Sequence, residues 1–92
     1  MREADIEKML VQAIEEIGGK AFKFASFSNA GVPDRIVLLD GKAYFVELKA
    51  PGQELRPLQK YRRKQFEEFG FEVYVIDSAA GVEEFINAVS AT

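Results

Sequence analysis

The 92-residue sequence contains neither cysteine nor histidine. Their absence excludes disulfide bonds, thiolate nucleophiles, zinc fingers and Ser-His-Asp triads, together with enzymes that use a histidine base. Any catalysis must therefore depend on carboxylates, lysine and a bound ion. The sequence also lacks an uncharged apolar run of about 18 residues and a charged-then-apolar leader, so it predicts neither a membrane span nor a secretory signal. We expect an intracellular, cytoplasmic protein.

The net charge is only −3, from 12 basic and 15 acidic side chains. This balance argues against a protein that coats DNA by charge alone. The basic residues are nevertheless concentrated, because residues 55–64 include five cations and no acid. The length and the 48% hydrophobic content predict one domain over residues 1–92 with a modest core.

Apolar residues at helical spacing predict an amphipathic helix over residues 2–17, ended by two glycines. Glu3 and Glu7 share a stripe at the border of its apolar face, from which a carboxylate can reach a site under the helix. We favour Glu7 for that role, with Glu3 as the alternative one turn earlier. Both can equally be ordinary surface residues, and Glu3 can simply complement the helix dipole.

The rest of the chain predicts strands over residues 20–26, 35–39, 43–49 and 71–76, and helices over residues 56–69 and after Ser78. The order α-β-β-β-α-β-α indicates one α/β domain, with helices packed against a mixed sheet. In the helix over residues 56–69 we expect Leu58, Tyr61, Phe66 and Phe69 to face the core. For Phe27, in the loop before the second strand, a core contact is favoured over stacking on a substrate or a partner.

Asp34, Glu47 and Lys49 form the most informative pattern in the sequence. An Asp-Gly pair at residues 40 and 41 predicts a tight type I′ hairpin, and counting outward from it sets Asp34 opposite Glu47. Glu47 and Lys49 are two residues apart on a strand and so emerge on the same face. A surface ladder of charges is the alternative interpretation, but the aligned register and the apolar alternate positions favour a site.

Neighbouring carboxylates repel each other unless a cation lies between them, and oxygen ligands of this kind suit Mg²⁺ or Mn²⁺ against a phosphate. The Lys49 ammonium could orient the attacking water or stabilise negative charge on the phosphate. The pattern therefore predicts a metal-dependent nuclease. On the following helix, Arg56, Gln59, Lys60 and Arg63 share one flank and are candidate phosphate contacts. A non-catalytic DNA-binding or assembly module that uses this basic helix, residues 56–64, is the competing hypothesis.

Three strings resemble the VRR-NUC (virus-type replication-repair nuclease) family of the PD-(D/E)xK nuclease superfamily. They are Gly-Val-Pro-Asp-Arg at residues 31–35, Val-Glu-Leu-Lys-Ala-Pro at residues 46–51 and Leu-Gln at residues 58–59. The resemblance covers nearly the whole chain and implies a restriction-endonuclease-like fold.

The same resemblance implies a role for each matching residue. Asp34 and Glu47 would ligate Mg²⁺ or Mn²⁺ together with the backbone carbonyl of Leu48, Lys49 would assist the attacking water, and Gln59 would belong to the catalytic group. It also strengthens the case for Glu7 as a metal ligand. Small members of the family resemble phage proteins that act as homodimers on branched DNA, including Holliday junctions, so we expect DNA and a second copy as partners in a phage or bacterial host cell.

Overall fold

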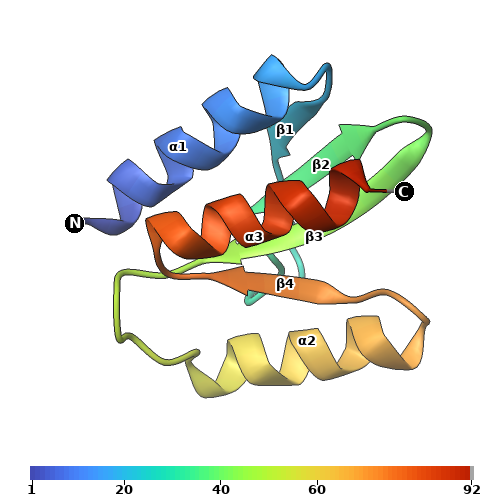
Figure 1. Cartoon of the computed structure of the whole chain (residues 1–92). Helices are drawn as coiled ribbons and strands as arrows, with labels where there is room; N and C mark the ends of the chain where they lie inside the picture. The colour runs from blue at the N-terminus through green and yellow to red at the C-terminus, as the bar shows by residue number, and fades with distance from the viewer. Residues whose placement is uncertain (92) are drawn as a thin grey trace.

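The computed structural model describes residues 1–91 (Figure 1). The elements follow in the order α1 (Glu3–Glu16), β1 (Lys20–Lys23), β2 (Arg35–Leu39), β3 (Lys42–Leu48), α2 (Pro57–Glu68), β4 (Val73–Ile76) and α3 (Ala79–Ser90). The predicted α-β-β-β-α-β-α order is confirmed. Within the described range, no helix combines the length and the apolar character needed to cross a membrane.

The four strands lie side by side in the order β1-β2-β3-β4. β1 pairs antiparallel with β2, and β2 pairs antiparallel with β3, whereas β4 runs parallel to β3. A parallel neighbour requires the chain to cross back over the sheet, and α2 makes this crossover. The sheet is therefore mixed, as the sequence predicted.

A two-residue turn sets the register of β2 against β3. The two residues of the Asp40-Gly41 turn have φ angles of 51° and 76°, the pair of left-handed conformations that defines a type I′ turn. The ladder that follows pairs Arg35 with Val46. Its next position is occupied by Asp34 and Glu47, so the register predicted for these two acids is confirmed.

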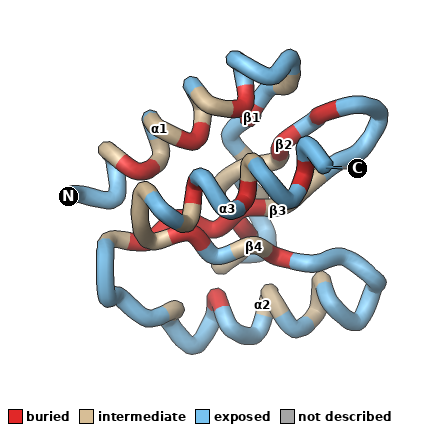
Figure 2. The backbone as a smooth tube through the Cα atoms, viewed as in Figure 1, coloured by how far each residue is buried: buried red, intermediate tan, exposed pale blue. Residues whose placement is uncertain are grey.

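α1 and α3 lie together on one face of the sheet (Figure 1). The apolar side chains between these helices and the strands are excluded from water, and the backbone of the buried residues is coloured red in Figure 2. This core contains Ile6, Leu10 and Ile14 from α1, Val37, Val46 and Leu48 from the sheet, and Val82, Phe85 and Val89 from α3. Burial of these residues follows the helical and strand spacing seen in the sequence.

The opposite face is covered by α2, which packs on it through aromatic rings. The Phe45 and Phe66 ring centroids are 5.0 Å apart and their planes are nearly perpendicular. Phe24 and Phe71 also pack edge-on or tilted against Phe45, with centroids 6.0 and 5.7 Å from its ring. These four phenylalanines attach α2 to the sheet.

Two expectations about exposed residues are wrong. Leu58, Tyr61 and Phe69 are 45%, 54% and 78% exposed, although we expected them in the core. Gln59 and Phe66, seven residues and two turns apart, instead define the side of α2 that faces the sheet. Phe27 is fully exposed and makes no core contact.

The first and last strands are shorter than predicted, because residues 24–26 and 71–72 lie outside β1 and β4.

Candidate active site

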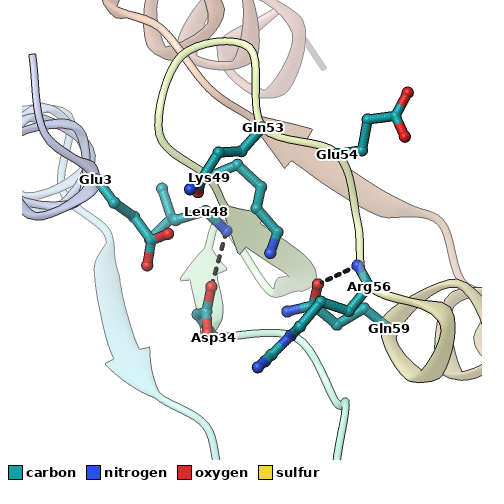
Figure 3. A pocket seen from close by; sticks show the side chains of 8 residues that line it. All are labelled: Glu3, Asp34, Leu48, Lys49, Gln53, Glu54, Arg56 and Gln59. Carbon is teal, nitrogen blue, oxygen red and sulfur yellow. Dashed lines mark hydrogen bonds between the residues drawn. The ribbon is translucent and has the colours of Figure 1, made fainter.

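An open pocket of about 450 Å³ lies where the end of β3 meets the beginnings of α1 and α2. Most of its lining side chains are polar or charged (Figure 3). They are Glu3, Asp34, Leu48, Lys49, Gln53, Glu54, Arg56 and Gln59. The pocket thus brings together five of the predicted site residues, Asp34, Leu48, Lys49, Arg56 and Gln59, with Glu3, the alternative helical acid. The other predicted residues do not line it, namely Glu7, Glu47, Lys60 and Arg63.

Asp34 enters the pocket from the position just before β2. Gly31, with a φ of 87°, and the buried Pro33 direct the chain into this position. The Asp34 Oδ2 atom accepts a hydrogen bond of 2.8 Å from the backbone N–H of Leu48, drawn as a dashed line in Figure 3. This bond holds the carboxylate against β3, next to Glu47.

Glu47 is an almost completely buried acid. It is 2% exposed, and its Oε1 atom is buried without a hydrogen-bond partner among the described residues. Burial raises the pKa of the Glu47 carboxyl to about 8, the adjacent Asp34 adds to the rise, and Lys49 opposes it. A charged carboxylate is costly in such surroundings unless a cation compensates it. The orphaned oxygen therefore favours a bound cation.

Lys49 follows directly on β3 and is 7% exposed. Its backbone N–H donates a hydrogen bond of 3.0 Å to the carbonyl of Ile76, which extends the pairing with β4 by one residue. The side chain emerges on the same side of the strand as Glu47 and reaches into the pocket (Figure 3). A nearly buried ammonium group requires acidic neighbours, and Asp34 and Glu47 provide them.

The two acids of α1 lie in different surroundings. Glu3 lines the pocket and also contributes to the raised pKa of Glu47. Glu7 accepts a hydrogen bond of 2.8 Å from the Arg35 Nε atom, in a separate surface hollow. Arg35 also donates from Nη1 to the carbonyl of Ala21 at 3.0 Å. The geometry therefore places Glu3 at the pocket, whereas our preferred helical acid, Glu7, ties α1 to the sheet.

Gln59 and Arg56 form the α2 side of the pocket. Gln59 is 8% exposed, and its Oε1 atom accepts a hydrogen bond of 2.9 Å from the backbone N–H of Arg56. This bond caps the first turn of α2, in the manner of a capping box. It also fixes the orientation of the amide, whose nitrogen keeps its donors for a ligand. The Arg56 side chain is exposed at the pocket border.

The other two predicted phosphate contacts lie further along α2. Arg63 borders a narrow hollow that Glu47 and Gln59 also line, and its Nε atom is buried without a hydrogen bond, 3.7 Å from the Glu67 carboxylate. Lys60 is exposed on the surface of the same helix. Of the flank predicted from the sequence, Arg56, Gln59 and Arg63 therefore border the pocket or the narrow hollow near the acids, whereas Lys60 lines neither.

Sequence reasoning missed three residues of this region. Gln53 and Glu54 line the pocket from the loop before α2, and the Glu54 carboxylate points away from the other acids in Figure 3. Arg62 donates a hydrogen bond of 2.8 Å from Nε to the carbonyl of Ala30 in the loop before Asp34. Periodicity cannot identify loop residues, and the only signal for Arg62 was its membership in the basic run.

The donor set fits a hard divalent cation that keeps part of its water shell. Among residues 1–91, no group of three or more Asp, Glu, His or Cys side chains is arranged to hold a metal ion. Mg²⁺ is commonly bound by one or two carboxylates, with water and substrate phosphate completing its coordination. Asp34, Glu47 and the carbonyl of Leu48 are the oxygen donors that meet this requirement.

Comparisons with known proteins identify the family of the chain. Residues 2–80 match the family model for the VRR-NUC domain. The chain is 47% identical over 79 residues to the "Putative nuclease p44" of Acyrthosiphon pisum secondary endosymbiont phage 1, a match that covers 85% of both proteins. A solved structure described as a VRR_NUC domain superimposes with a TM-score of 0.85 at 29% identity, over 92% of this chain and 94% of the other.

The family model and the phage relative both span most of the chain, and the solved domain shares its fold. The order of the elements and the mixed sheet agree with the match to the solved domain. The chain belongs to the VRR-NUC domain family of nucleases.

Proposed function

We propose that this protein is an endodeoxyribonuclease that depends on Mg²⁺ or Mn²⁺. The observation that carries the proposal is the buried, unpartnered Glu47 oxygen beside Asp34, which lines the open pocket together with Lys49. When bound, the ion would supply Lewis-acid polarisation of the phosphate and activation of water. Asp34, Glu47 and the carbonyl of Leu48 would hold it.

The protein's own side chains would position the substrate and manage charge. Lys49 would orient the attacking water or stabilise negative charge on the phosphate, because its side chain lines the pocket next to Asp34. Gln59 would donate a hydrogen bond from its amide nitrogen to the DNA. Glu3 takes the place of Glu7 as the proposed helical acid, since it lines the pocket. Arg56, Lys60 and Arg63 would contact the DNA backbone.

We further propose branched DNA, such as a Holliday junction, as the preferred substrate and a homodimer as the active form. A monomer of this size has room for one such pocket, whereas cutting opposed strands of a symmetric junction suits two pockets related by a two-fold axis. Such a substrate would be met inside a phage-infected cell. Light scattering at working concentration should return the mass of a dimer, and a monomer would count against this arrangement.

The catalytic proposal is tested by incubating four-way junctions, flaps and plain duplex with Mn²⁺. Wild-type protein should cut DNA, with branched substrates preferred, and Asp34→Asn or Lys49→Ala should lower the rate by at least about a hundredfold. Glu15→Gln, which removes an exposed acid on α1, is the matched control and should cut like the wild type. Equal cutting by all four proteins would disprove the proposal.

A DNA-binding module without catalysis is the second candidate. The exposed Arg56 and Lys60 on a helix rich in cations favour it. A pure binder, however, gains nothing from two acids next to phosphate. Salt-sensitive DNA binding with no cleavage in either Mg²⁺ or Mn²⁺ would decide for this alternative.

A further inference from the structure

The loop between β1 and β2 presents an aromatic side chain to solvent. Phe27 is fully exposed in this loop, which then runs through Pro33 to the proposed metal ligand Asp34. An isolated exposed apolar residue needs no explanation. Phe27 differs because the loop is held in place and because other exposed rings and cations lie on the helix that holds it.

The loop is attached to α2 by two contacts. Arg62 Nε donates to the carbonyl of Ala30 at 2.8 Å, and Gly31 lies so close to Leu58 that an added Cβ would be 2.8 Å from the Leu58 carbonyl oxygen. Within the loop, the Asn29 N–H donates to Ser26 Oγ at 3.2 Å, which closes the turn that contains residue 27. The aromatic side chain therefore stands on a constrained turn.

The part of α2 that holds the loop is itself aromatic and basic. Tyr61 is 54% exposed, and the Arg62 guanidinium carbon lies 5.2 Å from the centre of its ring. At most about three residue lengths, or roughly 10 Å, separate the Cα atoms of Phe27 and Ala30, the residue that Arg62 binds. We call the exposed Phe27, Leu58 and Tyr61 together with the half-buried Arg62, which ties the loop to α2, the stacking surface.

Resting on the proposed nuclease function, we propose that the stacking surface binds unpaired bases of DNA next to the phosphate that is cut. Exposed aromatic rings combined with cations bind single strands, because every base offers a face for stacking while the cations hold the backbone. The chain links this surface to the pocket at two points: the loop that carries Phe27 leads into Asp34, and Leu58 precedes Gln59 on α2, and both Asp34 and Gln59 line the pocket.

The charge of α2 favours DNA over a second copy of the chain. Residues 56–66 contain five cations and no acid, and the two acids of α2, Glu67 and Glu68, stand at its far end. A symmetric dimer through this surface would place like charges against each other across a two-fold axis, whereas a nucleic acid neutralises them. DNA with unpaired bases is therefore the occupant that the surface fits.

The experiment compares binding to two DNAs in EDTA, where binding is measured apart from cutting. One is a plain duplex, and the other is the same duplex with a single-stranded flap that carries 2-aminopurine at its base. Phe27→Ala should weaken flap binding by about tenfold, the loss expected for one base stack, and change duplex binding less than twofold. Phe27→Trp should restore both the affinity and the quenching of 2-aminopurine. Phe69→Ala, which removes an exposed ring at the far end of α2, is the matched control and should bind like the wild type.

Several results would overturn the inference. Equal losses on flap and duplex, or no loss on either, would remove the stacking role of Phe27. A lower molar mass of Phe27→Ala in light scattering, with flap preference unchanged, would show that the surface joins copies of the chain. If the wild type prefers the flap, Phe27→Ala loses that preference and neither protein cuts DNA in Mn²⁺, the proposed nuclease function is refuted while binding of unpaired bases by the stacking surface stands. If the wild type cuts DNA and Phe27→Ala has no effect on flap binding, the inference is refuted and the proposed function stands.

Discussion

Glu47 is buried at a place where Asp34 already provides a carboxylate, and one of its oxygens has no hydrogen-bond partner among the described residues. Proteins seldom bury an acid in this way without a compensating group, because the charged form loses its hydration. The folded protein therefore keeps Glu47 protonated well above the usual range of a glutamate, with a pKa raised to about 8 by burial and then by Asp34. A cation bound next to Glu47 would instead favour the ionised carboxylate.

The first prediction concerns the pH dependence of metal-free stability. Between pH 4.5 and 8 the folded protein holds a proton on Glu47 that the unfolded chain releases, so the free energy of unfolding should fall as pH rises through this window. Glu47→Gln keeps the shape and removes the titration. The free energy of unfolding of Glu47→Gln should exceed that of the wild type by about 2 kcal/mol at pH 8. This is less than the full shift in the Glu47 pKa implies, because Lys49 and nearby solvent lower the cost of burying the charge.

Urea unfolding in EDTA at pH 5 and pH 8 measures this difference. Glu15→Gln, which removes an exposed acid from α1, serves as the control and should follow the wild type at both values. If both variants gained the same stability at pH 8, the effect would belong to net charge and not to the buried carboxyl.

The second prediction separates the two acids of α1. Glu3→Gln should weaken Mn²⁺ binding by about tenfold, because it removes a negative charge from the pocket, and should leave stability nearly unchanged. Glu7→Gln should lower stability by about 1 kcal/mol through its weakened bond to Arg35, with little effect on Mn²⁺. Calorimetric titration measures the affinity for Mn²⁺, and thermal unfolding measures the stability. If Glu7→Gln weakened Mn²⁺ binding and Glu3→Gln did not, Glu7 would be the helical acid of the site.

The sequence was enough to predict which acids of the strands lie together, but not which acid of α1 lies at the pocket. The Asp40-Gly41 turn fixes the pairing of β2 with β3, so counting residues was enough to place Asp34 opposite Glu47. Glu3 and Glu7 lie one turn apart on the same stripe, and spacing cannot distinguish them. Their difference depends on Arg35, which points from β2 toward α1 and takes Glu7 as its partner.

At the scale of elements, the loop that ends at Asp34 depends on its contact with α2. Gly31 has a φ of 87° and lies against the backbone of Leu58. Gly70 has a φ of 91° with open space around it, so it offers the same backbone strain without the contact. The two glycines therefore form a matched pair for measuring what the contact contributes.

The third prediction follows from this pair. Gly31→Ala should lower stability by about 2 kcal/mol more than Gly70→Ala, because its Cβ would displace the loop from α2. Gly31→Ala should also weaken Mn²⁺ binding, since Asp34 is three residues away, whereas Gly70→Ala should not. Chemical unfolding and calorimetric titration measure both quantities. Similar losses in the two variants would mean that the loop position does not depend on Leu58.

The orientation of α2 shows where element-level reasoning failed. Its apolar residues at positions 58, 61 and 69 suggested a core-facing stripe, yet all three are exposed. The helix meets the sheet through the Phe66 ring and the capping amide of Gln59. A helix that shares its inner face with a polar pocket does not follow the rule that apolar residues define the buried side.

Across the whole molecule, the two faces of the sheet are covered unequally. Figure 2 shows buried segments along the strands and on the inner sides of α1 and α3, whereas α2 is mostly exposed. Gln59 is the one buried residue of α2 and is polar, while α1 and α3 each bury three apolar side chains. The helix that carries the proposed DNA contacts therefore buries the fewest apolar side chains.

The fourth prediction is that α2 opens separately from the rest of the fold. Its amide hydrogens should exchange through an opening that costs less free energy than global unfolding, which should govern exchange in α1 and α3. Phe66→Ala should lower the exchange free energy of α2 by more than that of α1, because it removes the ring packed on Phe45. Leu10→Ala, in the completely buried core, should lower the exchange free energy of α1 and α3 by about 3 kcal/mol.

Native-state hydrogen exchange by mass spectrometry or NMR measures these values for each helix. Mn²⁺ together with a DNA flap should slow exchange in α2 more than in α1, because the pocket and the stacking surface both include its first turns. Separate opening would let α2 move to admit branched DNA while the α1 and α3 layer keeps Asp34 and Glu47 in register. Identical exchange free energies for the three helices would instead mean that the pocket opens only when the whole fold does.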